Sequence, residues 1–133
     1  MKSERMETLE GLLKSGISPI LLENFPASIF TDAVVLDGTC SKEELTGHYE
    51  EITYSPPEWY KKLMDSSKQH TPVLIIKDIN KIPEEEQRKF IELFKYRKVY
   101  VHKLPENCMI FATYSNLEER PIQEELYSFM VHI

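Results

Sequence analysis

The residues best placed to do chemistry include a lysine and an aspartate that follow the most apolar run of the chain. Lys77 and Asp78 come directly after residues 72–76, which are all apolar. A continuous apolar run of this length is typical of a central parallel strand that is covered on both faces. Successive residues of a strand point to opposite faces, so these two side chains cannot act as a close pair. We interpret them as the solvent-facing end of the strand.

A second candidate group combines basic and aromatic side chains near the end of a predicted helix. Its members are Lys95, Tyr96, Arg97, Lys98, Tyr100, His102 and Lys103. Such a mixture can follow a nucleic-acid backbone and stack on bases. The candidate nucleic-acid contacts are Lys95, Arg97, Lys98, Tyr100 and Lys103. The simpler interpretation is that positive charge at a helix C-terminus complements the helix dipole.

The remaining reactive side chains form no catalytic or metal-binding pattern. The chain contains no G-x-S-x-G nucleophile motif, and its histidines and cysteines lack metal-ligand spacing. These residues are His48, His70, His102, His132, Cys40 and Cys108. We expect no metal, no cofactor and two reduced, partly buried thiols. Near residues 56–57, an aromatic group either binds a protein or closes the edge of a core: Tyr49, Tyr54, Trp59 and Tyr60.

Composition and charge indicate one soluble, intracellular domain. The chain has 133 residues, with 16 basic against 22 acidic side chains and a formal net charge of -6. This acidic excess argues against a general polyanion binder. The N-terminal sequence MKSERMETLE lacks the apolar segment of a signal peptide, and no apolar run approaches the length of a membrane span. We therefore expect a cytoplasmic protein without a membrane partner.

The elements that position the candidate residues alternate between strands and helices. Apolar runs predict buried strands at 20–22, 33–36, 72–76 and 109–113, a half-exposed strand at 99–102 and a last strand at 130–133. Helices are predicted at 1–16, after Ser41, after Ser55, at 83–97 and at 122–127. The two serines each open a capping box, and the helix after Ser55 should direct Trp59, Leu63 and Met64 toward the core. The alternation predicts an α/β fold with a mostly parallel sheet.

Several segments follow one another in the order of a known family. Four segments carry the similarity. They are residues 73–83, which read VLIIKDINKIP, residues 87–101, residues 104–105 together with 110–113, and residues 121–129. They resemble, in turn, the Walker B strand, the helix and hairpin after it, the sensor 1 strand and the closing segment of an AAA+ ATPase core. The MoxR and dynein- or midasin-like branch is the most similar, and residues 44–49 resemble its E-L-x-G-x-Y turn.

This resemblance is good over residues 72–133 and loose over 17–71. It implies a single three-layer domain over residues 1–133, similar to P-loop NTPases. The domain would be shortened around the P-loop and would lack the helical lid.

The resemblance also implies that the phosphate and metal machinery is missing. Residues 24–32 stand where a phosphate loop is expected, yet they contain neither glycine nor lysine. Lys77 and Asp78 fall on the two acidic positions of Walker B, and a lysine there repels Mg²⁺ instead of binding it. Both departures indicate a degenerate Walker region.

The later catalytic positions depart in the same way. After Thr113, the sensor 1 asparagine falls on Ser115, or on Asn116 with one inserted residue, and the arginine finger falls on Ser128. We therefore expect a pseudo-ATPase that is no enzyme: a protein-interaction or regulatory module. Its partner would be an active AAA+ relative or a second copy of itself. The alternative is a nucleic-acid-associated accessory protein that uses residues 95–103.

Overall fold

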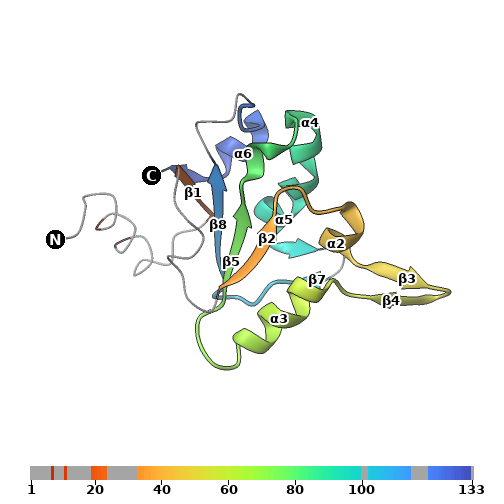
Figure 1. Cartoon of the computed structure of the whole chain (residues 1–133). Coiled ribbons are helices and arrows are strands. Elements are labelled where there is room, and N and C mark those ends of the chain that lie inside the picture. The colour runs from red at the N-terminus through yellow and green to blue at the C-terminus, as the bar shows by residue number, and fades with distance from the viewer. Residues whose placement is uncertain are drawn as a thin grey trace.

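A computed structural model describes residues 7, 11, 19–23, 33–99, 102–114 and 120–132, and the structural statements below concern these residues. They form a five-stranded sheet in which all neighbouring strands are parallel. The strands are β1 (Ile20–Glu23), β2 (Val34–Asp37), β5 (Val73–Lys77), β8 (Met109–Tyr114) and β9 (Val131–His132). They lie in the order β2-β5-β8-β1-β9 (Figure 1). The predicted α/β fold with a mostly parallel sheet is confirmed.

The burial of the strands explains their positions in the sheet. Three consecutive residues of β5 and three of β8 are fully buried: Leu74, Ile75, Ile76, Ile110, Phe111 and Ala112. Such runs suit inner strands, because a parallel sheet is covered on both faces. β2 lies at an edge of the sheet and alternates instead. Its Val34 and Leu36 are buried, whereas Val35 is 47% exposed.

One face of the sheet packs against three helices, α3 (Glu58–Ser66), α5 (Ile91–Tyr96) and α6 (Glu124–Ser128). Their contributions to the core are Trp59, Leu63, Leu93, Phe94 and Leu126. Met64, in contrast, is 36% exposed, so its predicted place in the core was wrong. It follows Leu63 directly, and one residue is a turn of about 100° around a helix, which carries Met64 off the buried face.

The two predicted capping boxes had different outcomes. Ser41 caps α2 (Lys42–Thr46) as expected, because its Oγ accepts from the Glu44 amide at 3.0 Å while its own amide donates to Glu44 Oε1 at 3.2 Å. The second box does not form. α3 begins after Pro57, which makes no side-chain cap, and Ser55 is the last residue of a strand.

The helix predicted at 83–97 forms in three pieces. α4 (Glu84–Gln87) leads through a 3₁₀ turn (Arg88–Phe90) into α5. Arg97 ends α5 in the left-handed conformation, with φ 54°. A short 3₁₀ helix, Ile79–Lys81, precedes this segment and connects it to β5.

Two antiparallel hairpins stand outside the main sheet. β3 (His48–Glu50) pairs with β4 (Thr53–Ser55), and β6 (Lys98–Val99) pairs with β7 (His102–Lys103). The second hairpin replaces the single strand predicted at 99–102. The first was not predicted, and Figure 1 shows it extending away from the body of the domain. The stretch 24–32 lies outside the described residues, as does nearly all of the helix predicted at 1–16.

Candidate functional site

Two predicted site residues meet at the carboxyl ends of β5 and β8. Asp78 follows β5 in the left-handed conformation, with φ 52°, and its amide donates to Thr113 Oγ1 at 2.9 Å. Its carboxylate lies 3.4 Å from Lys81 Nζ. Thr113 is 3% exposed, whereas Lys77 is exposed at the end of β5. The polar groups of Asp78 are therefore already engaged by neighbouring residues.

The end of β2 adds an acidic group that sequence analysis missed. Asp37 accepts two hydrogen bonds from Thr39, one from the amide at 3.0 Å and one from Oγ1 at 2.7 Å. Partial burial opposes its ionisation, but these bonds and the charges of Lys81 and Lys77 together hold the pKa of Asp37 below its usual value. An aspartate two residues before a threonine at a turn is the signal that could have revealed it.

Gly38 joins the turn after β2 to the end of β5. Its amide donates to the Lys77 carbonyl at 2.7 Å. A Cβ atom at position 38 would lie 2.7 Å from the carbonyl oxygen of Asp78, which is closer than a carbon atom can approach. Glycine is therefore required for β2 and β5 to end side by side.

A buried amide ties the segment before α6 to the rest of the domain. Gln87 is fully buried, and its Nε2 donates to the Ile82 carbonyl at 3.0 Å and to the Pro121 carbonyl at 2.9 Å. Its Oε1 accepts from the Gln123 amide at 2.7 Å. Because all three bonds go to the backbone of this chain, we assign Gln87 a structural role.

Among the described residues, Ser128 does not join the Asp78–Thr113 pair. Ser128 ends α6, and its Oγ donates to the Glu125 carbonyl at 2.6 Å within the same helix. Ser115 and Asn116 lie outside the described residues. The structure therefore brings Asp78 and Thr113 together, and leaves Ser128 bonded within its own helix.

The basic segment after α5 is partly accessible. Tyr96 is 59% exposed, and the ammonium groups of Lys95 and Lys98 lie 5.3 and 5.7 Å from its ring centroid. Lys98 also lies 4.0 Å from Glu92 Oε1. These two lysines and the ring form a small exposed basic and aromatic surface.

Other members of the predicted nucleic-acid group are placed differently. The Arg97 guanidinium donates to the Cys108 carbonyl, so part of its bonding capacity is used inside the domain. Lys103 is exposed on β7, and Tyr100 lies outside the described residues. Both Cys108 and Cys40 are buried free thiols, as expected. Burial raises the pKa of the Cys108 thiol to about 11.

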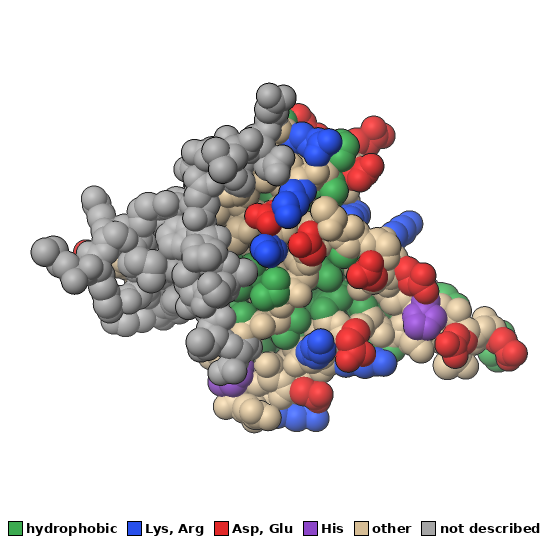
Figure 2. All heavy atoms as spheres, in the orientation of Figure 1, with side chains coloured by type: hydrophobic (Ala, Val, Ile, Leu, Met, Phe, Trp, Pro, Cys, Tyr) green, Lys and Arg blue, Asp and Glu red, His purple; other side chains and the backbone are tan. Residues whose placement is uncertain are grey.

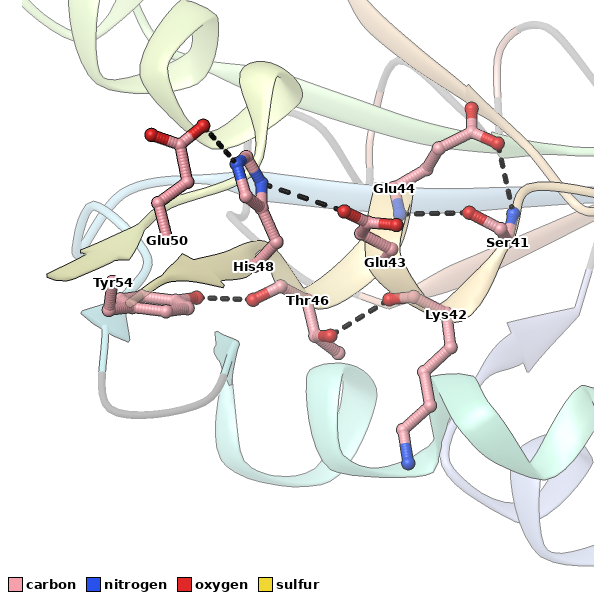
Figure 3. Close-up of polar contacts among 8 residues, drawn as sticks. All are labelled: Ser41, Lys42, Glu43, Glu44, Thr46, His48, Glu50 and Tyr54. Atoms are coloured by element: carbon pink, nitrogen blue, oxygen red, sulfur yellow. Dashed lines mark hydrogen bonds and ion pairs between the residues drawn. The ribbon is translucent and has the colours of Figure 1, made fainter. Parts of the chain in front are cut away.

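The β3–β4 hairpin is firmly held at its base (Figure 3). Gly47 begins it with φ 88°, and the Tyr54 hydroxyl donates to the Thr46 carbonyl. The His48 ring lies 3.9 Å from Glu43 and 3.6 Å from Glu50, measured between nitrogen and carboxylate oxygen. The contacts with Glu43 and Thr46 tie the hairpin to α2, whereas Glu50 lies on the same strand as His48.

Aromatic rings extend this anchorage into the body of the domain. The Tyr54 ring stacks on His102 with centroids 5.4 Å apart, and the Tyr60 ring lies 5.3 Å from His102 on a tilted plane. The Tyr60 hydroxyl donates to the Lys103 carbonyl at 2.8 Å. Trp59 is buried, and its indole N–H donates to the Leu45 carbonyl at 2.9 Å. Three of the four aromatic residues near Pro56 therefore close the edge of the core.

The tip of the same hairpin is solvent-exposed and combines one isoleucine with two acidic residues, Glu50 and Glu51. Ile52 is 93% exposed and Tyr49, on β3, is 56% exposed. Glu51 precedes Ile52 in the left-handed conformation, with φ 56°, which costs a non-glycine residue about 1 kcal/mol.

A groove lies beside the edge strand β2. It has a volume of about 670 Å³ and is lined by residues of β2, of α2 and of the first turns of α3. A smaller hollow of about 390 Å³ shares Ala33 and Lys62 with it and continues along α3. Figure 2 shows hydrophobic side chains gathered over this region and charged side chains of both signs around them.

Among the described residues, no group of three or more histidine, cysteine, aspartate or glutamate side chains is arranged to hold a metal ion. In the same part of the chain, no helix has the length and apolar character needed to cross a membrane.

The comparisons with known proteins give a likeness of fold alone. No family model matches the chain, and no curated protein matches it. A solved structure of NtrX from Brucella abortus is similar over the whole chain, with a TM-score of 0.58 and 11% sequence identity. The match covers 36% of the NtrX chain, so this chain spans about a third of that protein.

The identification with AAA+ ATPases has to be corrected on these findings. No family model supports it, and the structural match is to NtrX. At 11% identity this match assigns no function. Numbered along the chain, the strands of the main sheet lie in the order 2-3-4-1-5. The likeness to NtrX is one of parallel α/β architecture.

Proposed function

We propose that this chain is a non-catalytic protein-interaction module with a regulatory role. The observation that carries this proposal is the exposed tip of the β3–β4 hairpin, where Ile52 is 93% exposed beside the exposed acidic residues Glu50 and Glu51. The hairpin is anchored at its base by Gly47 and Tyr54, so its tip is presented at a fixed place. Burying such a side chain in a partner contributes about 1.5 to 3 kcal/mol.

The polar groups at the carboxyl edge of the sheet support a non-catalytic role. Substrates of open α/β folds bind at this edge. Here the carboxylate of Asp37 accepts hydrogen bonds from Thr39. The Asp78 amide donates to Thr113 Oγ1, and the Asp78 carboxylate lies beside Lys81 Nζ. Polar groups that already satisfy one another offer little to a substrate.

Two measurements test the proposal. A titration with fluorescent mant-ATP should give no binding, and micromolar affinity would contradict the non-catalytic role. Affinity capture from the native host should recover a specific partner protein with the wild type and lose it with Ile52→Glu. Met64→Glu, an exposed apolar position on α3, is the matched control and should retain the partner. Equal recovery with both variants would exclude the hairpin as the docking element.

A second candidate function is nucleic-acid association through residues 95–103. It is favoured by the exposed Tyr96 ring with Lys95 and Lys98 beside it. Retardation of single-stranded DNA at low salt, weakened by added salt and lost in Lys95→Glu/Lys98→Glu, would support it. Lack of retardation at low salt would exclude it.

A further inference from the structure

We propose that the tip of the β3–β4 hairpin docks on the basic and aromatic surface at the end of α5 in a second copy of this chain. The proposal rests on the interaction role inferred above and adds to it the identity of a partner and the place where that partner is contacted. It is carried by the opposite charges of the two surfaces, by their exposed apolar groups and by their position on neighbouring hairpins.

The β3–β4 hairpin is an acidic projection. Residues 48–55 contain two glutamates, Glu50 and Glu51, and neither lysine nor arginine. Both glutamates are exposed, and in the described part of the chain neither forms an ion pair with a lysine or an arginine. Figure 2 shows acidic side chains gathered over the outer part of this hairpin. The tip therefore presents two negative charges beside Ile52.

The surface at the end of α5 has the opposite charge. Residues 95–103 contain four lysine or arginine side chains and no acidic one. Lys98 lies directly opposite Lys103 in the β6–β7 hairpin, so their charges are close together. Lys95 and Lys103 are exposed, and neither has an ion pair among the described residues.

The acidic side chains near this surface offset only part of its charge. Glu92, on α5, lies 4.0 Å from Lys98 and compensates that lysine. On the neighbouring helix α6, Glu125 is directed to Arg88, with 4.0 Å between the nitrogen and the carboxylate oxygen. The charges of Lys95 and Lys103 therefore remain available for carboxylates from outside the chain.

Each surface also exposes an apolar group that the other could cover. Ile52 is 93% exposed at the tip, and Tyr96 is 59% exposed at the end of α5. The ammonium groups of Lys95 and Lys98 lie on either side in sequence and 5.3 and 5.7 Å from the ring centroid of Tyr96. An isoleucine packed on this ring, with glutamate–lysine pairs around it, has the apolar centre and polar rim of a protein interface.

The places of the two surfaces in the fold favour a second copy as the occupant. Tyr54 of one hairpin stacks on His102 of the other, so the hairpins are neighbours. The tip nevertheless extends away from the body of the domain (Figure 1), and the Tyr96 ring of the same chain stays exposed. A two-fold axis beside neighbouring surfaces lets each copy give its tip and receive the tip of the other, which closes a dimer.

Sedimentation velocity of the wild-type chain, freed of nucleic acid by nuclease, tests this dimer. The contact is small, so we expect a dissociation constant of about 10 to 100 μM in about 50 mM salt. Dimerisation should weaken in about 0.5 M salt, where the charges are screened.

Charge reversal identifies the surfaces. Glu50→Lys/Glu51→Lys and Lys95→Glu/Lys98→Glu should each weaken dimerisation by about tenfold or more, because each places like charges in contact. Glu84→Lys/Glu85→Lys makes the same change of net charge as the tip variant, at exposed positions of α4, and should leave dimerisation unchanged. Circular dichroism shows that each variant has kept its fold.

The two charge-reversed variants also test each other. When they are mixed in equal amounts, the new lysines of one face the new glutamates of the other, and the remaining native surfaces match as well. The mixture should therefore dimerise with about the affinity of the wild type. A wild type that stays monomeric up to about 0.5 mM, an α4 variant as weak as the tip variant, or a mixture that stays monomeric would each overturn self-docking.

Partner capture separates self-docking from the proposed function. If the wild type stays monomeric while capture of a different protein is lost with Ile52→Glu, the interaction role stands and self-docking fails. If the mixed variants restore the dimer while capture of other proteins is insensitive to Ile52→Glu, the hairpin docks on its own chain and self-docking stands.

Discussion

The amide of Asp78 donates a hydrogen bond to Thr113 Oγ1 at 2.9 Å and so joins the ends of the two central strands. Asp78 can make this bond because its backbone is left-handed directly after β5. Thr113 is 3% exposed, so water cannot replace the hydroxyl group if it is removed. The bond is therefore best understood as a stabilising contact between β5 and β8.

Removal of this acceptor should destabilise the domain. We expect Thr113→Val to lower the free energy of unfolding by about 1 to 3 kcal/mol, because it leaves the Asp78 amide without its partner. Urea denaturation followed by circular dichroism measures the change. Thr53→Val makes the same replacement at an exposed position of the hairpin and should change stability by less than about 0.5 kcal/mol. Equal effects of the two variants would refute the role given to Thr113.

Replacement of Gln87 should have a larger effect. Gln87→Leu keeps the approximate size of the side chain but removes three hydrogen bonds to the backbone. We expect a loss of about 3 kcal/mol and faster hydrogen exchange at the Gln123 amide. Gln69→Leu, at an exposed site, is the control. Unchanged exchange at Gln123 would show that Gln87 does not hold the segment before α6.

Because Gly38 lies close to the Asp78 carbonyl group, a single methyl group added at position 38 should destabilise the domain. In Gly38→Ala the new Cβ would meet the Asp78 carbonyl oxygen at 2.7 Å, so β2 and β5 must separate. We expect a loss of about 1 to 3 kcal/mol, as for other overpacked sites. Gly11→Ala is the matched control, since a Cβ at position 11 meets nothing within 4 Å among the described residues. Thermal unfolding would distinguish the two, and a Gly38→Ala protein as stable as wild type would contradict this geometry.

The lowered pKa of Asp37 predicts that the free energy of unfolding depends on pH in the acid range. Its pKa is lower in the folded chain than its ordinary value of 3.8, so the folded state favours the ionised carboxylate. The resulting stabilisation is present above the ordinary pKa and is lost as the pH falls through the folded pKa. The effect should be modest, because the side chain is only partly buried and its charge interactions are screened by solvent.

Urea denaturation between about pH 6 and pH 2 should therefore show a shallower acid decline for Asp37→Asn than for wild type. Thr39→Val removes one of the two hydrogen bonds and should give an intermediate slope. Identical slopes for all three proteins would mean that Asp37 does not contribute.

The central strands could be predicted because each of them is an unbroken run of apolar residues in the sequence. The β3–β4 hairpin could not, because its turn residues, Glu51 and Ile52, are not those that favour a two-residue turn. The site was predicted only in part. Lys77 and Asp78 were treated as neighbours in a strand, whereas Asp78 lies beyond its end with a left-handed backbone. Such a conformation depends on Thr113, which is 35 residues away in the chain.

The similarity of motif order to AAA+ ATPases was misleading for a related reason. Walker B and sensor 1 strands are apolar runs that end in polar residues, and any buried pair of parallel strands has this pattern. The roles of Gln87 and Gly38 were missed because both depend on contacts between segments that are distant in the sequence. Glutamine and glycine have no periodicity that would indicate such contacts.

The stacking of Tyr54 on His102 joins two hairpins that are separate in the sequence. Tyr54 belongs to the β3–β4 hairpin, and His102 belongs to the hairpin that carries Lys98 and Lys103. Loss of either ring would therefore remove a packing contact of both hairpins at once.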